Sequence, residues 1–322
     1  MSELLNISGL TVELPTAAGW VRPVNDVSLR VAEGEALGLV GESGSGKTML
    51  SLALMGLLPE GARVTGDAVL HTKERTRLTL GNLSENEWRT VRGREIAMIF
   101  QEPLTSLNPV MRAGAQIEEA IRAHEPQISG SLLKRHLLEA LEQASVPEPE
   151  VRAEQFPHQL SGGLRQRAMI AMALSAHPRL LIADEPTTAL DVTVQKQILE
   201  LLARLRRELE LSMLFITHDL GVVAKVADRI AVMYAGRIVE EGPTLQVLTA
   251  PRHPYTQGLL AASPSLERGK LVPIPGTVPQ LTELPRGCAF APRCSYRRTE
   301  CEQAMPELRA VDATHAARCV LV

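Results

Sequence analysis

Residues 41–48, GESGSGKT, form a glycine-rich loop of the kind that holds phosphate groups. They fit the pattern G-x-x-x-x-G-K-[ST] between a short apolar run and a helix-like segment, the context that this motif requires. Glycines let consecutive backbone N–H groups turn towards a β-phosphate. Lys47 then places positive charge between the β- and γ-phosphates, and the Thr48 hydroxyl can ligate Mg²⁺. We therefore interpret the loop as a nucleotide site rather than an ordinary glycine-rich turn. Its residues are Gly41, Glu42, Ser43, Gly44, Ser45, Gly46, Lys47 and Thr48.

A second chemical group is the acidic pair that closes the segment LLIADE at 180–185. Four apolar residues predict a buried strand, and Asp184 emerges at its carboxyl end, where open α/β sheets bind ligands. There it can hold Mg²⁺, usually through water. Glu185 is the natural general base or water-orienting group for attack on a γ-phosphate. Alone, such a pair could simply cap the next element, but beside a phosphate loop it indicates hydrolysis.

A second glycine pair lies in LSGGLRQR at 160–167, after a serine and at the start of a helix-like segment. The N–H groups at a helix N-terminus, together with the helix dipole, form an anion site. The alternative is a plain helix N-cap made by Ser161. One chain thus carries two segments that could hold phosphate.

Four cysteines, Cys288, Cys294, Cys301 and Cys319, fall as C-x5-C-x6-C-x17-C in a proline-rich segment with little periodicity. Such a segment has too little regular apolar surface to order itself, which favours a cross-link or a ligand. A reducing cytosol disfavours disulfides. Four thiolates suit tetrahedral Zn²⁺ or a [4Fe–4S] cluster, and the absence of close C-x2-C pairs favours the larger cluster. Four unliganded cysteines on a loose extension are the remaining alternative.

The elements that must position these residues are short apolar strands alternating with helices. Apolar runs at 34–40, 95–100, 180–185, 211–219 and 229–236 predict strands, and LLNISGLTVEL at 4–14 predicts an edge strand. Helix-like segments such as VTVQKQILELLARLRREL at 192–209 lie between them. The pattern predicts an α/β fold with a mostly parallel sheet covered on both faces. Residues from about 104 to 176 predict a helical insertion, and the composition change after Pro251 indicates a separate extension.

Composition excludes some classes of function. The chain has 322 residues with 45% hydrophobic and 3% aromatic content and a net charge of −3. Nucleic-acid binding needs a basic face or stacking aromatics, so it is disfavoured. The acidic N-terminal segment is unlike a signal peptide, and no apolar run reaches the length of a membrane span. We expect a soluble, cytosolic chain that a partner must hold at any membrane.

Six segments occur in the order found in ATP-binding cassette (ABC) ATPases, over about 240 residues. They are GESGSGKT, FQEP at 100–103, LSGGLRQR, LLIADEP, ALD at 189–191 and THD at 217–219. The resemblance implies a RecA-like P-loop core with an antiparallel β subdomain and a helical subdomain, here over residues 1–250. It places Gln101 by Mg²⁺, the attacking water and the membrane partner, and His218 by the γ-phosphate. Without the resemblance, these two residues would be read as a surface glutamine and a satisfied core histidine.

In this family two ATPase subunits pack head to tail, and each ATP lies between the phosphate loop of one and the LSGG segment of the other. The resemblance therefore implies that Ser161, Gly162 and Gly163 serve a neighbour's nucleotide, and that Asp191 reaches the opposing subunit. Leu164 stands where relatives often carry Gln or Met. The family also stacks adenine on an aromatic residue; Trp20 is the nearest candidate, although it lies a residue or two from the expected position. Aliphatic side chains are the alternative.

Within the family, ALDVTVQ, MYAGRIVEEGP, HPYTQGLL, IPGTVP and the cysteine-bearing segment at 251–322 resemble the ATPases of bacterial dipeptide and oligopeptide importers. Some of those ATPases carry a [4Fe–4S] cluster, which we expect to be structural because cysteines would fill all four corners. Related importers carry nickel chelates, opine-type metallophores or other small solutes. The resemblance implies two permeases, an external substrate-binding protein and a second ATPase, commonly a different chain. It also implies a peripheral position on the cytoplasmic face of the inner membrane.

Two other classes of function fit less well. A soluble ABC protein acting on DNA or ribosomes predicts two cassettes in one chain or a long coiled-coil insertion, with a basic surface. A regulatory module that binds ATP without hydrolysing it predicts a missing catalytic acid, whereas Lys47, Glu185 and His218 are all in place.

Overall fold

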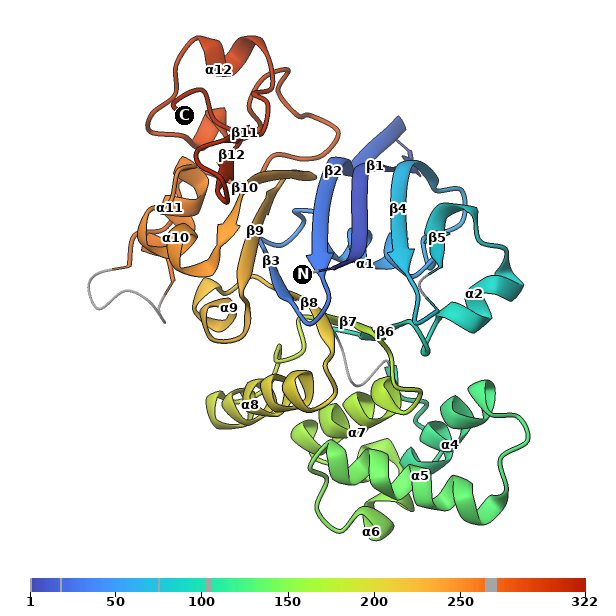
Figure 1. The fold of residues 1–322 in the computed structure, drawn as a ribbon. Helices are drawn as coiled ribbons and strands as arrows, with labels where there is room; N and C mark the ends of the chain where they lie inside the picture. The colour runs from blue at the N-terminus through green and yellow to red at the C-terminus, as the bar shows by residue number, and fades with distance from the viewer. Residues whose placement is uncertain (1, 18, 75, 102–105, 264–270) are drawn as a thin grey trace. The chain divides into compact units, whose positions relative to one another are not determined.

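The structure, a computed structural model, describes residues 2–17, 19–74, 76–101, 106–263 and 271–322 (Figure 1). The chain divides into two units. The first contains Met1–His71, Arg77–Asn82 and Phe215–Val322, and the second contains Thr72–Thr76 and Leu83–Leu214. Residues 102–105, where the helical insertion was expected to begin, lie outside the described ranges.

One sheet of the first unit is antiparallel, with the strand order β2-β1-β4-β5. Its strands are β1 (Glu3–Thr16), β2 (Gly19–Ala32), β4 (Arg63–His71) and β5 (Arg77–Thr79). The expectation of an edge strand near the N-terminus is wrong, because β1 pairs with β2 on one side and β4 on the other. Alternating burial shows only that one face of a strand is covered, and this holds equally for edge and central strands of such a sheet.

The other sheet of the first unit has the strand order β11-β12-β10-β9-β3. Its strands are β3 (Ala36–Val40), β9 (Arg229–Tyr234), β10 (Arg237–Pro243), β11 (Arg309–Ala310) and β12 (Ala316–Ala317). The strands β3 and β9 are parallel, as the apolar runs predicted, and all five residues of β3 are buried. Parallel strands covered on both faces need such continuous apolar sequence.

Helices accompany these strands. They are α1 (Lys47–Leu54), η1 (Leu80–Asn82), α9 (Leu220–Val226), α10 (Thr244–Thr249), α11 (Pro254–Ala261), η3 (Ala291–Arg293) and α12 (Glu300–Gln303). The helix α1 packs against β2, and α9 packs against β3. In the described part of the chain, no helix combines the length and the apolar character needed to cross a membrane.

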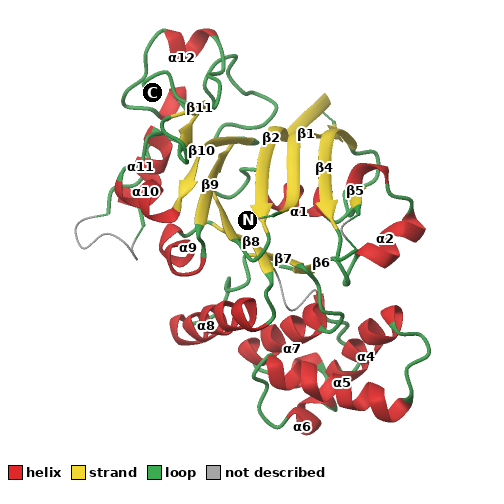
Figure 2. Cartoon of the chain, in the orientation of Figure 1, coloured by secondary structure: helices red, strands yellow, loops and turns green. Residues whose placement is uncertain are grey.

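The second unit contains a parallel strand pair and most of the long helices. The strands β6 (Ile96–Ile99) and β7 (Leu180–Asp184) pair in parallel, and every residue of both is buried. The helices are α2 (Glu85–Val91), α4 (Ala113–His124), α5 (Gly130–Gln143), α6 (Pro149–Ala153), η2 (Pro157–Gln159), α7 (Gly162–Leu174) and α8 (Val192–Glu208). Figure 2 shows α4 to α7 gathered together, and the described residues from 106 to 179 contain no strand. The buried strand β8 (Ser212–Thr217) crosses the boundary between the units.

The cysteine-bearing segment belongs to the first unit, and a buried carboxylate anchors it. Glu240 of β10 is fully buried and accepts hydrogen bonds from the backbone N–H groups of Arg252 (2.6 Å) and His253 (2.9 Å). His315 Nε2 bonds the same carboxylate at 2.7 Å. Three separate parts of the chain thus converge on one side chain, and a buried carboxylate requires such partners.

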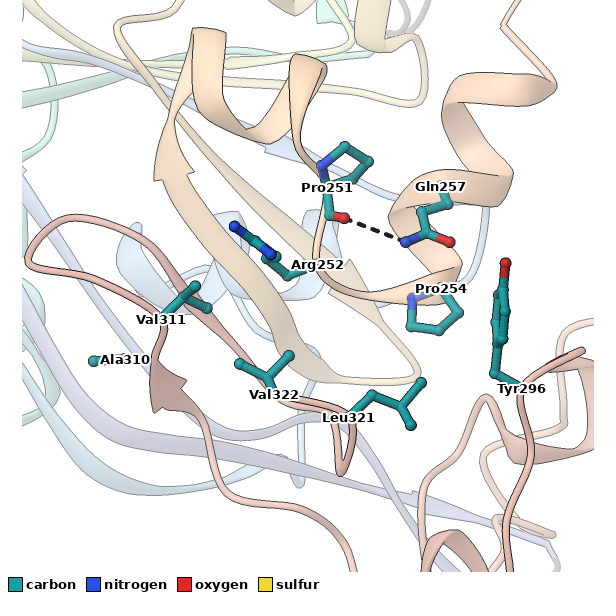
Figure 3. Close-up of a pocket in the computed structure, with 9 residues that line it drawn as sticks. All are labelled: Pro251, Arg252, Pro254, Gln257, Tyr296, Ala310, Val311, Leu321 and Val322. Carbon is teal, nitrogen blue, oxygen red and sulfur yellow. Dashed lines mark hydrogen bonds between the residues drawn. The ribbon is translucent and has the colours of Figure 1, made fainter.

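The end of the described chain closes against the start of this segment. Figure 3 shows Leu321 and Val322 around one pocket with Pro254 of α11 and Tyr296. The Gln257 amide donates to the Pro251 carbonyl at 3.2 Å beside it. Leu321 and Val322 therefore lie close to the start of α11.

His253 makes the stability of the first unit depend on pH. Burial lowers its pKa to about 3, whereas an unfolded histidine titrates near about 6.5. Between these values the unfolded chain binds a proton that the folded chain excludes, so stability falls as the pH falls below about 6.5. His253 also caps α11, its Nδ1 accepting the Tyr255 N–H at 3.0 Å.

Asparagine can still cap the helix, so we use His253→Asn as the test. Between pH 7 and pH 5 the free energy of unfolding of the parent should fall by about 2 kcal/mol more than that of the variant. Urea unfolding of both proteins at the two pH values measures this difference. Equal pH dependence in the two proteins would contradict the assignment.

Candidate functional site

The glycine-rich loop of the first unit joins β3 to α1. A Cβ atom at Gly41 would collide with the Met233 carbonyl oxygen of β9, and one at Gly46 with the Pro23 carbonyl oxygen of β2. Gly46 also has φ of 106°, in the region that favours glycine. The backbone of β9 and of β2 therefore lies in close contact with the two ends of the loop. Only glycine, which has no side chain, allows such an approach.

Lys47 is folded back over the same loop. Its side chain is buried, and the ammonium donates to the carbonyl oxygens of Gly41 (2.7 Å) and Glu42 (3.0 Å) and to Ser45 Oγ (3.3 Å). These acceptors are neutral, and hydrogen bonds to an anionic phosphate are stronger than bonds to neutral groups. The loop thus holds a cation where it can exchange its bonds for phosphate oxygens.

The helix after the loop adds to this anion site. Among the described residues, no side chain caps the N-terminus of α1, where Gly46 is the N-cap, and the first turn carries no acid. The first N–H groups of a helix have no partner within it, and the helix dipole favours negative charge there. The loop and helix together have the properties of a phosphate site.

The second unit carries the acidic pair. Asp184 ends β7 and is 1% exposed. Glu185 follows with φ of 47°, a backbone conformation uncommon for a residue other than glycine. Its carboxylate accepts hydrogen bonds from Thr188 Oγ1 (2.8 Å) and Gln101 Nε2 (3.3 Å). The structure thus brings together Gln101 and Glu185, which are 84 residues apart, and Thr188, which the sequence had not identified, orients the carboxylate.

The LSGG segment begins α7. Ser161 Oγ accepts the Leu164 N–H at 3.4 Å, so the serine is the helix N-cap that the simpler interpretation expected. A Cβ at Gly163 would lie 2.8 Å from Val194 Cγ1 of α8, so that glycine is needed for helix packing. Ser161 and Gly162 are exposed at the start of a 13-residue helix. Capping and an exposed anion site therefore coexist here.

Asp191 and His218 occupy helix-start positions in different units. Asp191 caps α8, because its Oδ1 accepts the Val194 N–H at 2.9 Å. His218 is exposed between β8 and α9, so it is not a core histidine. Asp219 beside it caps α9 by accepting the Gly221 N–H at 2.8 Å.

Trp20 lies at the start of β2 and is 45% exposed. The guanidinium carbon of Arg63 lies 3.9 Å from the centre of its ring, within the range of a cation–π contact. Arg63 therefore occupies one face of the Trp20 ring, and an adenine ring that stacked there would compete with Arg63 for that face.

The four cysteines are free thiols that line one small pocket, together with His253 and Phe290. Cys301 and Cys319 are buried, and burial raises the pKa of Cys288 to about 11. Within the described ranges, no three His, Cys, Asp or Glu side chains are arranged closely enough to hold a metal ion. The thiols thus face a common cavity without having converged into a ligand set.

Sequence reasoning missed the contacts between the segment after residue 250 and the glycine-rich loop. Tyr255 Oη accepts the Glu42 N–H at 2.8 Å, and the Arg293 guanidinium binds the Glu42 carboxylate. Both partners lie more than 200 residues from Glu42, and no periodicity or spacing signals such a pair.

Comparison with known proteins identifies the class. Residues 24–188 match the ABC transporter family, and residues 239–301 match the family described as oligopeptide/dipeptide transporter, C-terminal region. The solved dimeric structure of MJ0796, described as a bacterial ABC transporter cassette, superposes with a TM-score of 0.65 at 27% identity, covering 75% of this chain and 99% of that one. The chain belongs to the ABC transporter family, and it is an ATPase with the P-loop fold expected from the sequence.

Its similarity to curated relatives extends over almost the whole chain. A putative peptide import ATP-binding protein of Brucella ovis is 50% identical over 327 residues, covering 98% of this chain and 96% of that protein. The oligopeptide transport ATP-binding protein OppD of Bacillus subtilis is 50% identical over 321 residues, covering 98% of this chain and 88% of OppD.

Proposed function

We propose that this protein is the ATP-hydrolysing subunit of a bacterial importer of dipeptides or oligopeptides. The observation that carries the proposal is the match of residues 239–301 to the C-terminal region of oligopeptide/dipeptide transporters. Relatives named for peptide import, at 50% identity, support it. Importers of nickel chelates, metallophores or other small solutes are the alternative, because an ATPase of this kind does not line the path of the solute.

In this proposal the loop from Gly41 to Thr48 binds the phosphates of ATP. The ammonium of Lys47 exchanges loop carbonyls for phosphate oxygens, and the N-terminus of α1 adds backbone N–H donors. Thr48, Gln101 and Asp184 offer oxygen donors of the kind that Mg²⁺ prefers. Bound there, Mg²⁺ would neutralise phosphate charge during hydrolysis.

Glu185 is the proposed general base. Thr188 and Gln101 both donate to Oε2 of its carboxylate, which orients a group that can accept a proton from the attacking water. His218 contacts the γ-phosphate in this proposal, and its exposure is compatible with that role.

The second phosphate-holding segment serves a second ATPase subunit. The exposed start of α7 at Ser161, Gly162 and Gly163 offers the nucleotide of an opposing subunit a helix N-terminus, and Asp191 reaches across as well. The solved MJ0796 cassette is described as dimeric. The proposed partners are two transmembrane permeases, a second ATPase that is commonly a different chain, and an external substrate-binding protein. The complex would lie at the inner membrane with this subunit on the cytoplasmic face.

The proposed domain limits are a cassette over 1–250, with a helical subdomain over about 104–176, and an extension over 251–322. In the extension, Cys288, Cys294, Cys301 and Cys319 would hold a [4Fe–4S] cluster, with zinc as the alternative. The shared pocket of the four thiols supports a common ligand. Such a group would supply a structural cross-link, since four cysteines leave no corner of the cluster open.

The base assignment predicts that Glu185→Gln keeps ATP affinity within about 2-fold but lowers turnover by roughly 100-fold or more, because proton abstraction is lost. Uptake of labelled peptide by cells that carry the variant should stop with it. Glu200→Gln, an exposed acid on α8, is the matched control. Turnover at the parent rate by the Glu185→Gln variant in the assembled transporter would refute the assignment of the base. If cells with the variant lost uptake of nickel chelates while peptide uptake stayed normal, the alternative cargo would be favoured.

The sharing of sites predicts that Ser161→Arg blocks ATP hydrolysis by the assembled pair while the isolated chain still binds ATP. A bulky cation at the start of α7 would fill the space for a neighbour's phosphate. Ser161→Ala removes the helix cap without adding bulk, so it should lower stability by about 1 kcal/mol and impair hydrolysis less than Ser161→Arg does. Equal loss of ATP binding by the isolated Ser161→Arg chain would mean that both segments hold one nucleotide.

The cysteine assignment predicts about four iron and four sulfide per chain after anaerobic purification, with a visible absorption band. Cys288→Ser should lower both contents together, and Ser295, next to Cys294, offers a control as Ser295→Ala. Stoichiometric zinc, or a colourless metal-free protein whose extension resists proteolysis, would rule out the cluster.

A further inference from the structure

Arg293 is a buried arginine whose donors are matched by acceptors. Its side chain is 5% exposed. The two terminal nitrogens donate to the two carboxylate oxygens of Glu42 at 2.7 and 3.0 Å, and Nε donates to the Pro275 carbonyl at 2.9 Å. A two-pronged arrangement of this kind fixes the carboxylate in orientation as well as in distance. The pair joins the cysteine-bearing extension to the second residue of the phosphate loop.

Every polar group of Glu42 is held in this way. Its N–H donates to Tyr255 Oη at 2.8 Å, and its carbonyl accepts from the Lys47 ammonium at 3.0 Å. The extension thus contacts the N–H and the carboxylate, and the carbonyl is bonded within the loop by Lys47 and by the Ser45 N–H at 3.2 Å. A displacement of Glu42 would move an acceptor of Lys47.

A cluster of aromatic side chains packs near the Arg293–Glu42 pair. The rings of Tyr234, Tyr255 and Phe290 have centres 4.5 to 5.4 Å apart, and the Arg293 guanidinium carbon lies 5.9 Å from two of them. Tyr234 and Tyr255 are almost fully buried. The arginine therefore has little freedom to swing away from the loop.

The charge of Glu42 makes this contact important for ligand binding. A carboxylate on a loop that receives anionic phosphate opposes the ligand through like-charge repulsion, and solvent screens this only in part because the Glu42 side chain is 29% exposed. Arg293 pairs with that carboxylate and neutralises it. Removing one partner of such a pair leaves an uncompensated charge, whereas removing both does not.

We propose that Arg293 is a positioning residue for the phosphate loop: it neutralises and orients Glu42, so that the affinity of the loop for ATP depends on the extension. The proposal rests on nucleotide binding by the loop and is independent of the transported solute. It assigns to the extension an effect on the nucleotide site that does not require a metal.

The test is ATP binding by the isolated full-length chain, measured by titration with a fluorescent ATP analogue. Arg293→Met should weaken binding by roughly 10-fold, because Glu42 is left charged and unpaired, and added salt should reduce the defect. Glu42→Gln removes the repelling charge and keeps one side-chain oxygen that can accept from Arg293, so it should weaken binding less than Arg293→Met does. Arg293→Met with Glu42→Gln should return affinity to within about 3-fold of the parent. A contact that only supported folding would weaken binding in both single variants alike.

Two controls separate the possible failures. Arg297→Met removes an exposed arginine of the same extension. Arg297 pairs with Glu302 and, among the described residues, makes no ion pair with the loop, so affinity should not change. Lys47→Met should abolish binding; if it does not, the loop is not the nucleotide site. Suppose that Lys47→Met abolishes binding, so that the loop is the nucleotide site. The role of Arg293 is then refuted if Arg293→Met binds ATP like the parent. It is also refuted if the weaker binding of Arg293→Met persists in the folded double variant. Should Arg293→Met fail to fold, Glu42→Gln decides alone, because a loss of affinity of about 10-fold or more there overturns the proposal.

Discussion

The close approach of backbone to the phosphate loop is the constraint on which the first unit depends. Gly41 lies against the carbonyl of Met233, and Gly46 lies against that of Pro23, so β9 and β2 both press on the loop. The turn after β9 is tied to it as well, because the Gly236 N–H donates to the Ser45 carbonyl at 2.9 Å. A side chain at either glycine would push these strands apart, and the N-terminus of α1 would lose the position from which its N–H groups bind anions. The same absence of side chains that exposes the loop backbone to phosphate also allows the sheets to meet it.

The extension becomes part of this arrangement through a small number of buried polar groups. Glu240 binds Arg252, His253 and His315, which fixes the path of the chain before Cys288 and again between Cys301 and Cys319. That path brings α11 and η3 to the loop, where Tyr255 and Arg293 meet Glu42. The buried charged groups Glu240 and Arg293 both have partners, as the cost of an unpaired charge requires. The extension is thus held by directional contacts rather than by a large apolar face, which fits its proline-rich sequence.

Patterns that depend on neighbouring residues could be predicted from the sequence, and pairings between distant residues could not. Continuous apolar runs predicted β3, β6, β7, β8 and β9, since strands covered on both faces need them. The period of apolar residues likewise predicted α8. The helix α1 ends at Leu54, two residues before Gly56, whose φ of 62° does not continue a helix. The central place of β1 depends on which strands pair with it, and its own alternation contains no such information. For the same reason, the contacts of Thr188 with Glu185 and of Arg293 with Glu42 could not be predicted from the sequence. The phosphate loop could be predicted, because its functional groups lie in eight consecutive residues.

The Arg293–Glu42 pair is better explained by the position it specifies than by the stability it adds. Removing two charges from water costs several kcal/mol per ion in a protein, and apolar replacements of a buried pair are often neutral or stabilising. A stability argument would therefore favour an apolar contact at this place. An apolar contact, however, would neither orient the backbone of Glu42 nor leave its carbonyl facing Lys47. The pair admits one geometry, because two parallel hydrogen bonds and the Tyr255 hydroxyl must be satisfied together. A loop whose function is to present N–H groups and a cation to phosphate benefits from such a restriction more than from a further increment of packing.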